Sequence, residues 1–120
     1  DLFVLEDTTI GANSRARVPL DAWFEFPPGF WGLLLGRSST HTKLGLITNP
    51  GVIDGGFRGR MDANVSNPTG YPVHVKRGDR LAQLLPMVNQ APGLIVRRVE
   101  RLTDLGDSDR GQRGYGSTGK

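Results

Sequence analysis

The sequence predicts an all-β protein, an antiparallel barrel or sandwich with a flexible C-terminal arm. Short apolar or alternating runs recur at close spacing, which is typical of strands in an antiparallel fold. Turn-forming stretches separate these runs in a chain with 17 glycines and 8 prolines, among them FPPGF, TNPG, DGGFRG, SNPTGYP and NQAPG. The apolar periodicity ends near Thr103, and the sequence DLGDSDRGQRGYGSTGK follows. These observations favour a β-sheet body followed by an arm.

The first half of the chain offers three candidate strands and one helical turn. Residues 2–5, LFVL, form a continuous apolar run. Residues 23–26, WFEF, and 31–35, WGLLL, are rich in aromatic and aliphatic side chains, which fit a half-buried pleated surface. Residues 39–43, STHTK, are the stretch most compatible with a helical turn.

The second half offers four more candidate strands, each bounded by turn residues. Residues 61–65, MDANV, alternate between apolar and polar side chains, as a strand with one buried face does. The same reasoning applies to VHVK at 73–76 and LAQLL at 81–85. The last candidate is LIVRRV at 94–99, which is rich in β-branched residues.

The length and composition limit the domain organisation and the function. A chain of 120 residues can bury one hydrophobic core, so we expect one domain over residues 1–103 and the arm over 104–120. Asp1 is not methionine, and we expect the natural chain to begin earlier. The absence of cysteine excludes disulfides and thiolate catalysis.

The composition also bears on partners. No apolar run approaches the ~18–20 residues that cross a bilayer. The net charge is only +3, and the cations are scattered along the chain. We therefore expect no membrane and no nucleic acid as partner, and a cytoplasmic location, or a nuclear one in a eukaryote or virus.

The first polar cluster is GRSST, which follows the apolar run FWGLLL. Arg37 followed by Ser38 and Ser39 at a strand end offers a guanidinium fork and hydroxyl donors, which suit phosphate oxygens. The alternative is the start of a helix with a solvated arginine.

The second polar cluster is GVIDGGFRG, with Asp54 between an apolar pair and two glycines. The glycines would let the backbone turn sharply and approach a ligand closely. A carboxylate in this place could act as a general base or a metal ligand. The alternative is an ordinary turn aspartate.

The third polar feature is Gln83 in the apolar run RLAQLLP. A glutamine there must find hydrogen-bond partners or face solvent. Solvent exposure is the simpler alternative.

The final segment, RGQRGYGSTGK, combines glycines, cations and hydroxyl side chains with one aromatic residue, Tyr115. Segments of this kind are usually frayed ends. The alternative is a phosphate-binding arm, because glycines allow backbone N–H groups to converge on an anion.

Together these clusters carry a resemblance to a known family. DL at the start, PPGFWGLLLGRSS, NPGVIDGGFRG, GDRLAQL and RGQRGYGSTG occur in the order of the five motifs of the trimeric dUTPases. The resemblance covers essentially the whole chain, with the first motif cut off before Asp1. It implies a distorted jelly-roll β subunit, a homotrimer with three shared active sites, and Mg²⁺-dependent hydrolysis of dUTP to dUMP and pyrophosphate. That reaction would keep uracil out of DNA and supply dUMP for dTMP synthesis.

The resemblance also assigns roles to residues. Asp54 would activate the attacking water, Gln83 and Arg37 would orient the water or the phosphates, and Ser38 would donate to phosphate oxygens. Asp1 would reach the metal through water. Tyr115 would stack on uracil, and Arg110 with the Gly114 amide would meet the γ-phosphate. The remaining substrate-binding residues would be Ser39, Asn49, Gly51, Val52, Ile53, Phe57, Met61, Gly116, Ser117 and Thr118.

Three positions depart from the family pattern. Phe57 stands where most dUTPases have a tyrosine against the deoxyribose, so the ring stays but its hydroxyl is lost. Tyr115 stands where most members have phenylalanine. Arg113 adds a cation at a position that is commonly small.

Two alternatives to a dUTPase stay open. The sequence IDGGF is close to the dCTP deaminase pattern, but Asn64 stands where deaminases carry a catalytic glutamate, and an amide cannot move the proton that deamination needs. The other alternative is a dUTPase-fold protein that binds or regulates a host protein, and no surface in the sequence identifies such a partner.

Overall fold

The computed structural model describes residues 1–89 and 96–114, and the chain divides into two compact units, Asp1–Gln90 and Ala91–Lys120. The first unit contains one helix and the strands. These elements are β1 (Leu2–Phe3), β2 (Thr8–Ile10), β3 (Ser14–Trp23), β4 (Phe30–Gly36), α1 (Ser38–Leu44), β5 (Ile47–Thr48), β6 (Gly51–Ile53), β7 (Arg60–Asn67), β8 (Val73–Val75) and β9 (Arg80–Val88).

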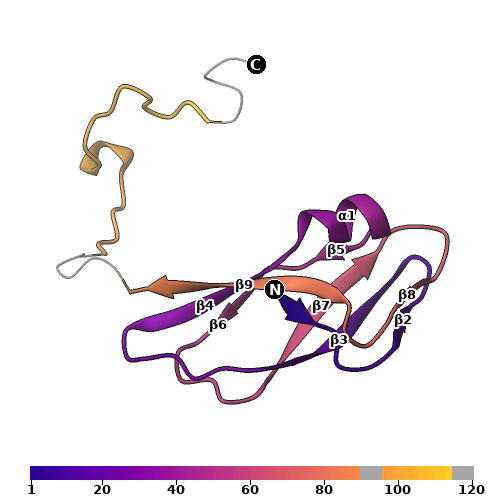
Figure 1. The fold of residues 1–120 in the computed structure, drawn as a ribbon. Helices are drawn as coiled ribbons and strands as arrows, with labels where there is room; N and C mark the ends of the chain where they lie inside the picture. The colour runs from indigo at the N-terminus through magenta and orange to yellow at the C-terminus, as the bar shows by residue number, and fades with distance from the viewer. Residues whose placement is uncertain (90–95, 115–120) are drawn as a thin grey trace. The chain divides into compact units, whose positions relative to one another are not determined.

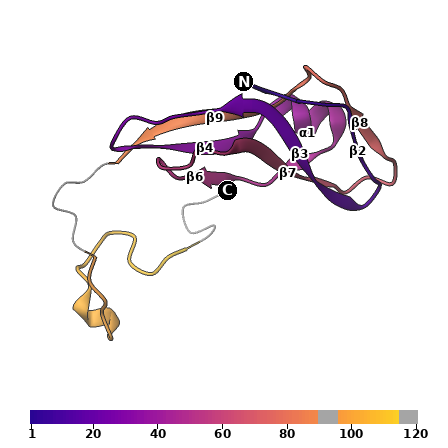
Figure 2. The same cartoon turned by 90° about the horizontal axis from the view of Figure 1, so that it is seen from below.

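The strands pair antiparallel in two sheets and a ribbon. The larger sheet has the order β1-β9-β4-β6, the smaller has the order β3-β7-β5, and β2 pairs with β8. Figure 1 shows β9 between β1 and β4, and Figure 2 shows β4, β6 and β9 side by side from below. In the larger sheet, Gly32 of β4 lies opposite Ile53 of β6 on one side and Pro86 of β9 on the other. β4 therefore lies between β6 and β9.

The hydrophobic core takes side chains from both sheets. Leu34 and Ala82 of the larger sheet and Val18, Met61 and Val65 of the smaller sheet belong to one buried cluster. β7 alternates strictly, with every second residue from Met61 to Asn67 buried. The alternation predicted for residues 61–65 is therefore confirmed, and the core leaves one face of each sheet outside.

Most of the predicted elements are present. The antiparallel all-β class is confirmed. The runs at 31–35, 61–65 and 81–85 lie in β4, β7 and β9, and the run at 73–76 contains β8, which ends at Val75. The helical turn predicted at 39–43 lies in α1, and the run at 2–5 contains β1 and an isolated bridge between Val4 and Leu20. Within the described residues the strands do not join into one closed barrel.

Two predicted strands are wrong. The strand expected at 23–26 ends at Trp23, because β3 runs from Ser14 and pairs with β7 instead. Phe24 and Phe26 leave the strand and stack on each other, with ring centroids 6.2 Å apart. Residues 96–99 of the strand expected at 94–99 are not in a strand, and Val96 is 91% exposed. Residues 94 and 95 lie outside the described part of the chain.

The second unit has little regular structure among residues 96–114. It contains a 3₁₀ turn at Leu102–Asp104, and Arg101 lies 3.6 Å from the Asp104 carboxylate. The predicted boundary between body and arm at 103/104 stays a prediction. In the described ranges no helix has both the length and the apolar composition needed to span a bilayer.

Candidate active site

Asp54 lies in the loop between β6 and β7, where the sequence predicted a sharp turn. The Phe57 N–H donates to the Asp54 carbonyl at 3.0 Å and closes this turn. Gly55 lies so close to β4 that a Cβ there would collide with the Phe30 carbonyl oxygen. The first glycine after Asp54 is thus required by a close approach of two backbone segments. The loop is held against the start of β4.

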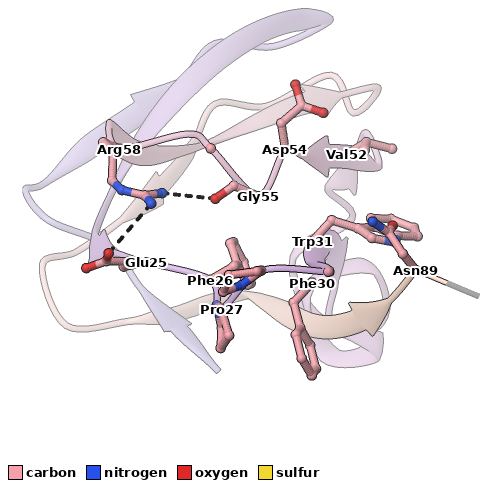
Figure 3. A pocket seen from close by; sticks show the side chains of 13 residues that line it. Glu25, Phe26, Pro27, Phe30, Trp31, Val52, Asp54, Gly55, Arg58 and Asn89 are labelled. Carbon is pink, nitrogen blue, oxygen red and sulfur yellow. Dashed lines mark hydrogen bonds and ion pairs between the residues drawn. The ribbon is translucent and has the colours of Figure 1, made fainter.

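The Asp54 side chain is exposed and reaches the edge of an open pocket of about 710 Å³. Phe26, Phe30 and Trp31 form the aromatic part of its lining. Figure 3 shows the Asp54 carboxylate pointing away from Phe26 and Phe30. An exposed carboxylate at the end of a strand can accept a proton from water or bind a cation, and it is not used as a hydrogen-bond acceptor by the described side chains.

A second polar cluster forms at the other end of β4, where Arg37 follows the strand. The Arg37 Nε lies 3.2 Å from the Asp1 carboxylate, and its Nη1 donates to the Arg80 carbonyl at 3.2 Å. Arg80 lies 3.8 Å from the same carboxylate and covers the Phe3 ring. The alternative is right that Arg37 stands at a helix start and wrong that it is solvated, because its side chain is only 26% exposed and is paired.

Helix α1 places the two serines beside Arg37. Arg37 is the backbone N-cap of α1, and Ser38 and Ser39 are its first residues. The buried Thr40 hydroxyl donates to the Leu81 carbonyl of β9 at 2.7 Å. This bond fixes the first turn of the helix to β9. Arg37, Ser38 and Ser39 directly precede Thr40, so the bond also fixes the backbone that carries their side chains.

Gln83 belongs to the same cluster. It lies opposite Leu35 in the β4–β9 pairing, and its Nε2 donates to the Gly36 carbonyl at 2.9 Å. The side chain is half-buried, so the alternative that Gln83 simply faces solvent is wrong. Its amide oxygen is left for a ligand or water.

The two clusters are separated by the length of β4. Asp54 follows Ile53, which pairs with Gly32, whereas Gln83 pairs with Leu35. At about 3.3 Å per residue along the strand and about 4.8 Å between strands, the Cα atoms of Asp54 and Gln83 lie about 16 Å apart. General acid–base chemistry needs contact at about 3 Å, directly or through one water. One copy of the chain therefore does not bring its own Asp54 and Gln83 onto one reacting atom.

Most of the other described residues predicted to bind substrate lie on β6, on β7 or in the loops next to them; the two strands belong to different sheets. Ile53, Phe57 and Met61 line a pocket of about 330 Å³, and Val52 lies at the edge of the larger pocket near Asp54. Asn49 lies in a third pocket beside Thr48, Pro50 and Asn64. The Phe57 ring lies against Gly59, where a Cβ would collide with it. Gly51, the first residue of β6, pairs with Leu34 of β4.

Sequence reasoning missed two arginines. Arg80 completes the Asp1–Arg37 cluster, and its presence in the motif GDRLAQL was the available signal. Arg58 lies in the motif IDGGFRG, and its guanidinium donates to the Gly55 carbonyl at 2.9 Å.

The arm residues are described only in part. Arg110 donates to the Arg113 and Gly114 carbonyls at 2.7 Å and 3.1 Å, so it folds back on its own segment. Tyr115, Gly116, Ser117 and Thr118 lie outside the described residues, and the roles assigned to them stay predictions.

No group of three or more histidine, cysteine or acidic side chains among residues 1–89 and 96–114 could by itself hold a metal ion. The carboxylate beside Arg37 and Arg80 comes from Asp1. Mg²⁺ usually keeps several waters and binds one or two carboxylates together with substrate phosphates, so a single carboxylate in this place fits that ion.

Comparison with known proteins agrees with this geometry. The family model described as dUTPase matches residues 1–119. The chain is 39% identical over 119 residues to the deoxyuridine 5'-triphosphate nucleotidohydrolase of fowl adenovirus A serotype 1, covering 99% of this chain and 64% of that protein. It is 36% identical over 122 residues to the enzyme of the same name from Mycolicibacterium gilvum, covering 99% of this chain and 79% of that one.

The solved structures point the same way. The dUTPase of Staphylococcus bacteriophage 80alpha, solved with dUPNHPP, superposes with a TM-score of 0.83 at 26% identity, covering 100% of this chain and 85% of that one. The dUTPase of phage phi11 of S. aureus, described with a structural Mg(II) ion, superposes with a TM-score of 0.73 at 25% identity, covering 84% and 82%. With the family match over nearly its whole length, its motifs in order and its fold in common with these enzymes, the chain belongs to the dUTPase family.

Proposed function

We propose that this chain hydrolyses dUTP to dUMP and pyrophosphate through attack of water on the α-phosphorus. The observation that carries the proposal is the pair of polar sites near the two ends of β4: the exposed Asp54 carboxylate beside its start, and an arginine, two serine hydroxyls and a glutamine amide beside its end. A carboxylate suits a water nucleophile, and the second group suits phosphate oxygens. The reaction removes dUTP from the nucleotide pool and yields dUMP.

The chemistry follows from the character of these groups. Asp54 accepts a proton from water as the water oxygen forms a bond to the α-phosphorus. The bond between that phosphorus and the oxygen bridging to the β-phosphorus breaks, and pyrophosphate leaves with the electron pair. Gln83 orients the water or a phosphate oxygen through its amide. Arg37 and Ser38 stabilise the charge that builds on the phosphate oxygens.

Asp1 is the residue that would hold Mg²⁺, through a water molecule. The ion, when bound, neutralises charge on the triphosphate and on the leaving pyrophosphate. Asp1 also holds Arg37 and Arg80 in place through its ion pairs of 3.2 Å and 3.8 Å.

The segment from Gly51 to Met61 accounts for the choice of substrate. The Phe57 ring packs against the deoxyribose and leaves no room for a 2′-hydroxyl, which excludes UTP. The backbone from Gly51 to Ile53 reads the edge of uracil, and the 5-methyl group of dTTP collides there. Ser39, Asn49 and Met61 complete the surroundings of the nucleotide.

The active enzyme is a homotrimer in which neighbouring copies share each site. The separation of about 16 Å between Asp54 and Gln83 supports this arrangement, because a second copy must supply the missing half. The outer face of the larger sheet supports it as well. Apart from Gln83, that face is apolar: Val52 is 67% and Leu85 42% exposed, and Trp31, Leu33, Leu35 and Met87 lie on it as well. A subunit contact would bury this face.

The C-terminal arm closes the site. Tyr115 stacks on the uracil ring, and Arg110, Ser117, Thr118 and the amides of Gly114 and Gly116 contact the γ-phosphate. Closure excludes water other than the nucleophile, and opening releases the product.

Pyrophosphate release from dUTP, dTTP, dCTP and UTP, each with and without Mg²⁺, tests the proposal. We expect strong preference for dUTP and dependence on the metal. Equal turnover of the four nucleotides would contradict the substrate assignment. Ammonia release from dCTP would instead indicate a deaminase.

A further inference from the structure

The loop from Asp54 to Gly59 carries two of the groups that the proposed function uses. Asp54 is its first residue and Phe57 its fourth, and Gly55 and Gly56 lie between them. Glycine has more backbone freedom to lose on ordering than any other residue. The described backbone bond inside this loop joins the Phe57 N–H to the Asp54 carbonyl. The loop needs a further constraint to hold both groups in one geometry.

The Arg58 side chain supplies that constraint from within the loop. Its Nη1 donates to the Gly55 carbonyl at 2.9 Å and to the Phe57 carbonyl at 3.2 Å. Hydrogen bonds from a charged donor are stronger than those between neutral groups. The two carbonyls flank Gly56, so one guanidinium bridges the most flexible part of the loop. Figure 3 shows Arg58 reaching the Gly55 carbonyl.

Backbone packing against β4 holds Gly55 from another direction. Gly55 lies against the Phe30 carbonyl with no room for a Cβ. Gly55 is thus fixed between the Arg58 guanidinium and the start of β4. The Asp54 carboxylate is attached one residue before this point, and the Phe57 ring two residues after it.

From these contacts we infer that Arg58 is a positioning residue of the active site. It sets the place of the Asp54 carboxylate and the Phe57 ring by tying together the Gly55 and Phe57 carbonyls. This inference rests on the proposed dUTP hydrolysis. Both bonds come from the Nη1 atom, whose N–H groups have fixed directions in the guanidinium plane. A lysine ammonium also has more than one N–H group on its nitrogen, but its flexible stem does not fix their directions, so it replaces the bridge only in part.

The ion pair of Arg58 with Glu25 contributes little to holding the Arg58 side chain in place. The nearest N–O distance is 3.6 Å, and the Glu25 side chain is 79% exposed. Exposed pairs of this kind contribute little because solvent screens them. Glu25→Gln is therefore a matched control, since it removes the charge partner and keeps the loop contacts.

The test compares Arg58→Ala, Arg58→Lys and Glu25→Gln with the wild-type chain in dUTP and UTP hydrolysis. We expect Arg58→Ala to lower kcat about 10- to 100-fold, the scale of a misplacement near 1 Å. KM for dUTP should change less than kcat, and discrimination against UTP should weaken because Phe57 moves with the loop. Arg58→Lys should lie between the wild type and Arg58→Ala, and Glu25→Gln should match the wild type.

Chemical rescue separates positioning from a general loss of structure. Guanidinium chloride at millimolar concentration, well below the denaturing range, should restore part of the kcat of Arg58→Ala by occupying the same carbonyls. Wild-type kcat and UTP discrimination in Arg58→Ala would overturn the inference. So would a raised KM with unchanged kcat, which would mean that Arg58 binds substrate directly. A wild-type chain without dUTP hydrolysis would instead overturn the proposed function.

Discussion

Shared active sites predict that two inactive variants restore activity in mixed trimers. Asp54→Asn removes the proton acceptor, and Arg37→Ala removes the guanidinium that is proposed to contact the phosphates. Trimers of either variant alone should be nearly inactive. In a mixed trimer, a site that takes Asp54 from an Arg37→Ala chain and Arg37 from an Asp54→Asn neighbour is complete.

The magnitude follows from the pairing of subunits. Random assembly of equal amounts makes about one quarter of the sites complete, because each site needs the right chain at two positions. Sharing is required because the Cα atoms of Asp54 and Gln83 in one chain lie about 16 Å apart, well beyond the reach of a proton transfer. If each chain held a whole site, the mixture would show only the residual activity of the two variants.

The assay is pyrophosphate release from dUTP after the variants are denatured together and refolded. Chains of different mass, one carrying a short tag, would show by native mass spectrometry that mixed trimers have formed. A second arm mixes the wild type with the double variant: shared sites leave about one quarter of the activity, whereas independent sites leave about one half. Mixed trimers that stay as inactive as the parents would refute the shared-site model.

Three further predictions address single residues. Asp54→Asn should leave the fold and dUTP binding intact and lower kcat at least about 10²-fold, the scale of a lost general base. A calorimetric titration with a non-hydrolysable analogue checks the binding. Turnover above a tenth of the wild-type value would remove Asp54 from the mechanism. Phe57→Ala should admit UTP as a substrate, whereas Phe57→Tyr should change activity only modestly; unchanged exclusion of UTP in the alanine variant would disprove the steric role of the ring. Tyr115→Ala should lower kcat/KM roughly 5- to 150-fold, because one base–aromatic stack contributes about 1–3 kcal/mol, and Tyr115→Phe is its near-silent control.

One prediction concerns stability. Thr40→Val should lower the free energy of unfolding by about 1–3 kcal/mol, because the Leu81 carbonyl loses its buried donor in a site of the same shape. Thermal unfolding monitored by circular dichroism measures the effect, with Thr42→Val on the exposed face of α1 as the control. Equal melting temperatures for the two variants would mean that the Thr40 bond does not fix the helix to β9.

Local patterns in the sequence determined much of the fold. The alternation in MDANV and the apolar runs at 31–35 and 81–85 predicted strands, because burial on one face of a sheet depends on side chains two residues apart. The motif around Asp54 also predicted a sharp turn at its glycines. The structure adds the reason for Gly55, whose backbone lies so close to the Phe30 carbonyl that only glycine fits.

Long-range pairing decided the rest. β3 was missed because SRARVPLDAW mixes charges and a proline with its apolar residues, and only pairing with β7 makes it a strand. The aromatic residues at 23–26 looked like a strand, yet Phe26 instead packs against Gly32.

Local patterns and long-range pairing also contributed differently to the candidate site. The sequence predicted Arg37, Asp54 and Gln83 individually, because each polar residue interrupts an apolar run. The pairing registers of β4 decided where they lie: Gln83 opposite Leu35, and Asp54 beyond the residue opposite Gly32. Spacing along a chain does not report distance across a sheet. Only the tertiary structure therefore shows that the Asp54 carboxylate lies apart from Arg37 and Gln83. It alone also shows that the Arg58 side chain bonds the carbonyls of the loop that carries Asp54.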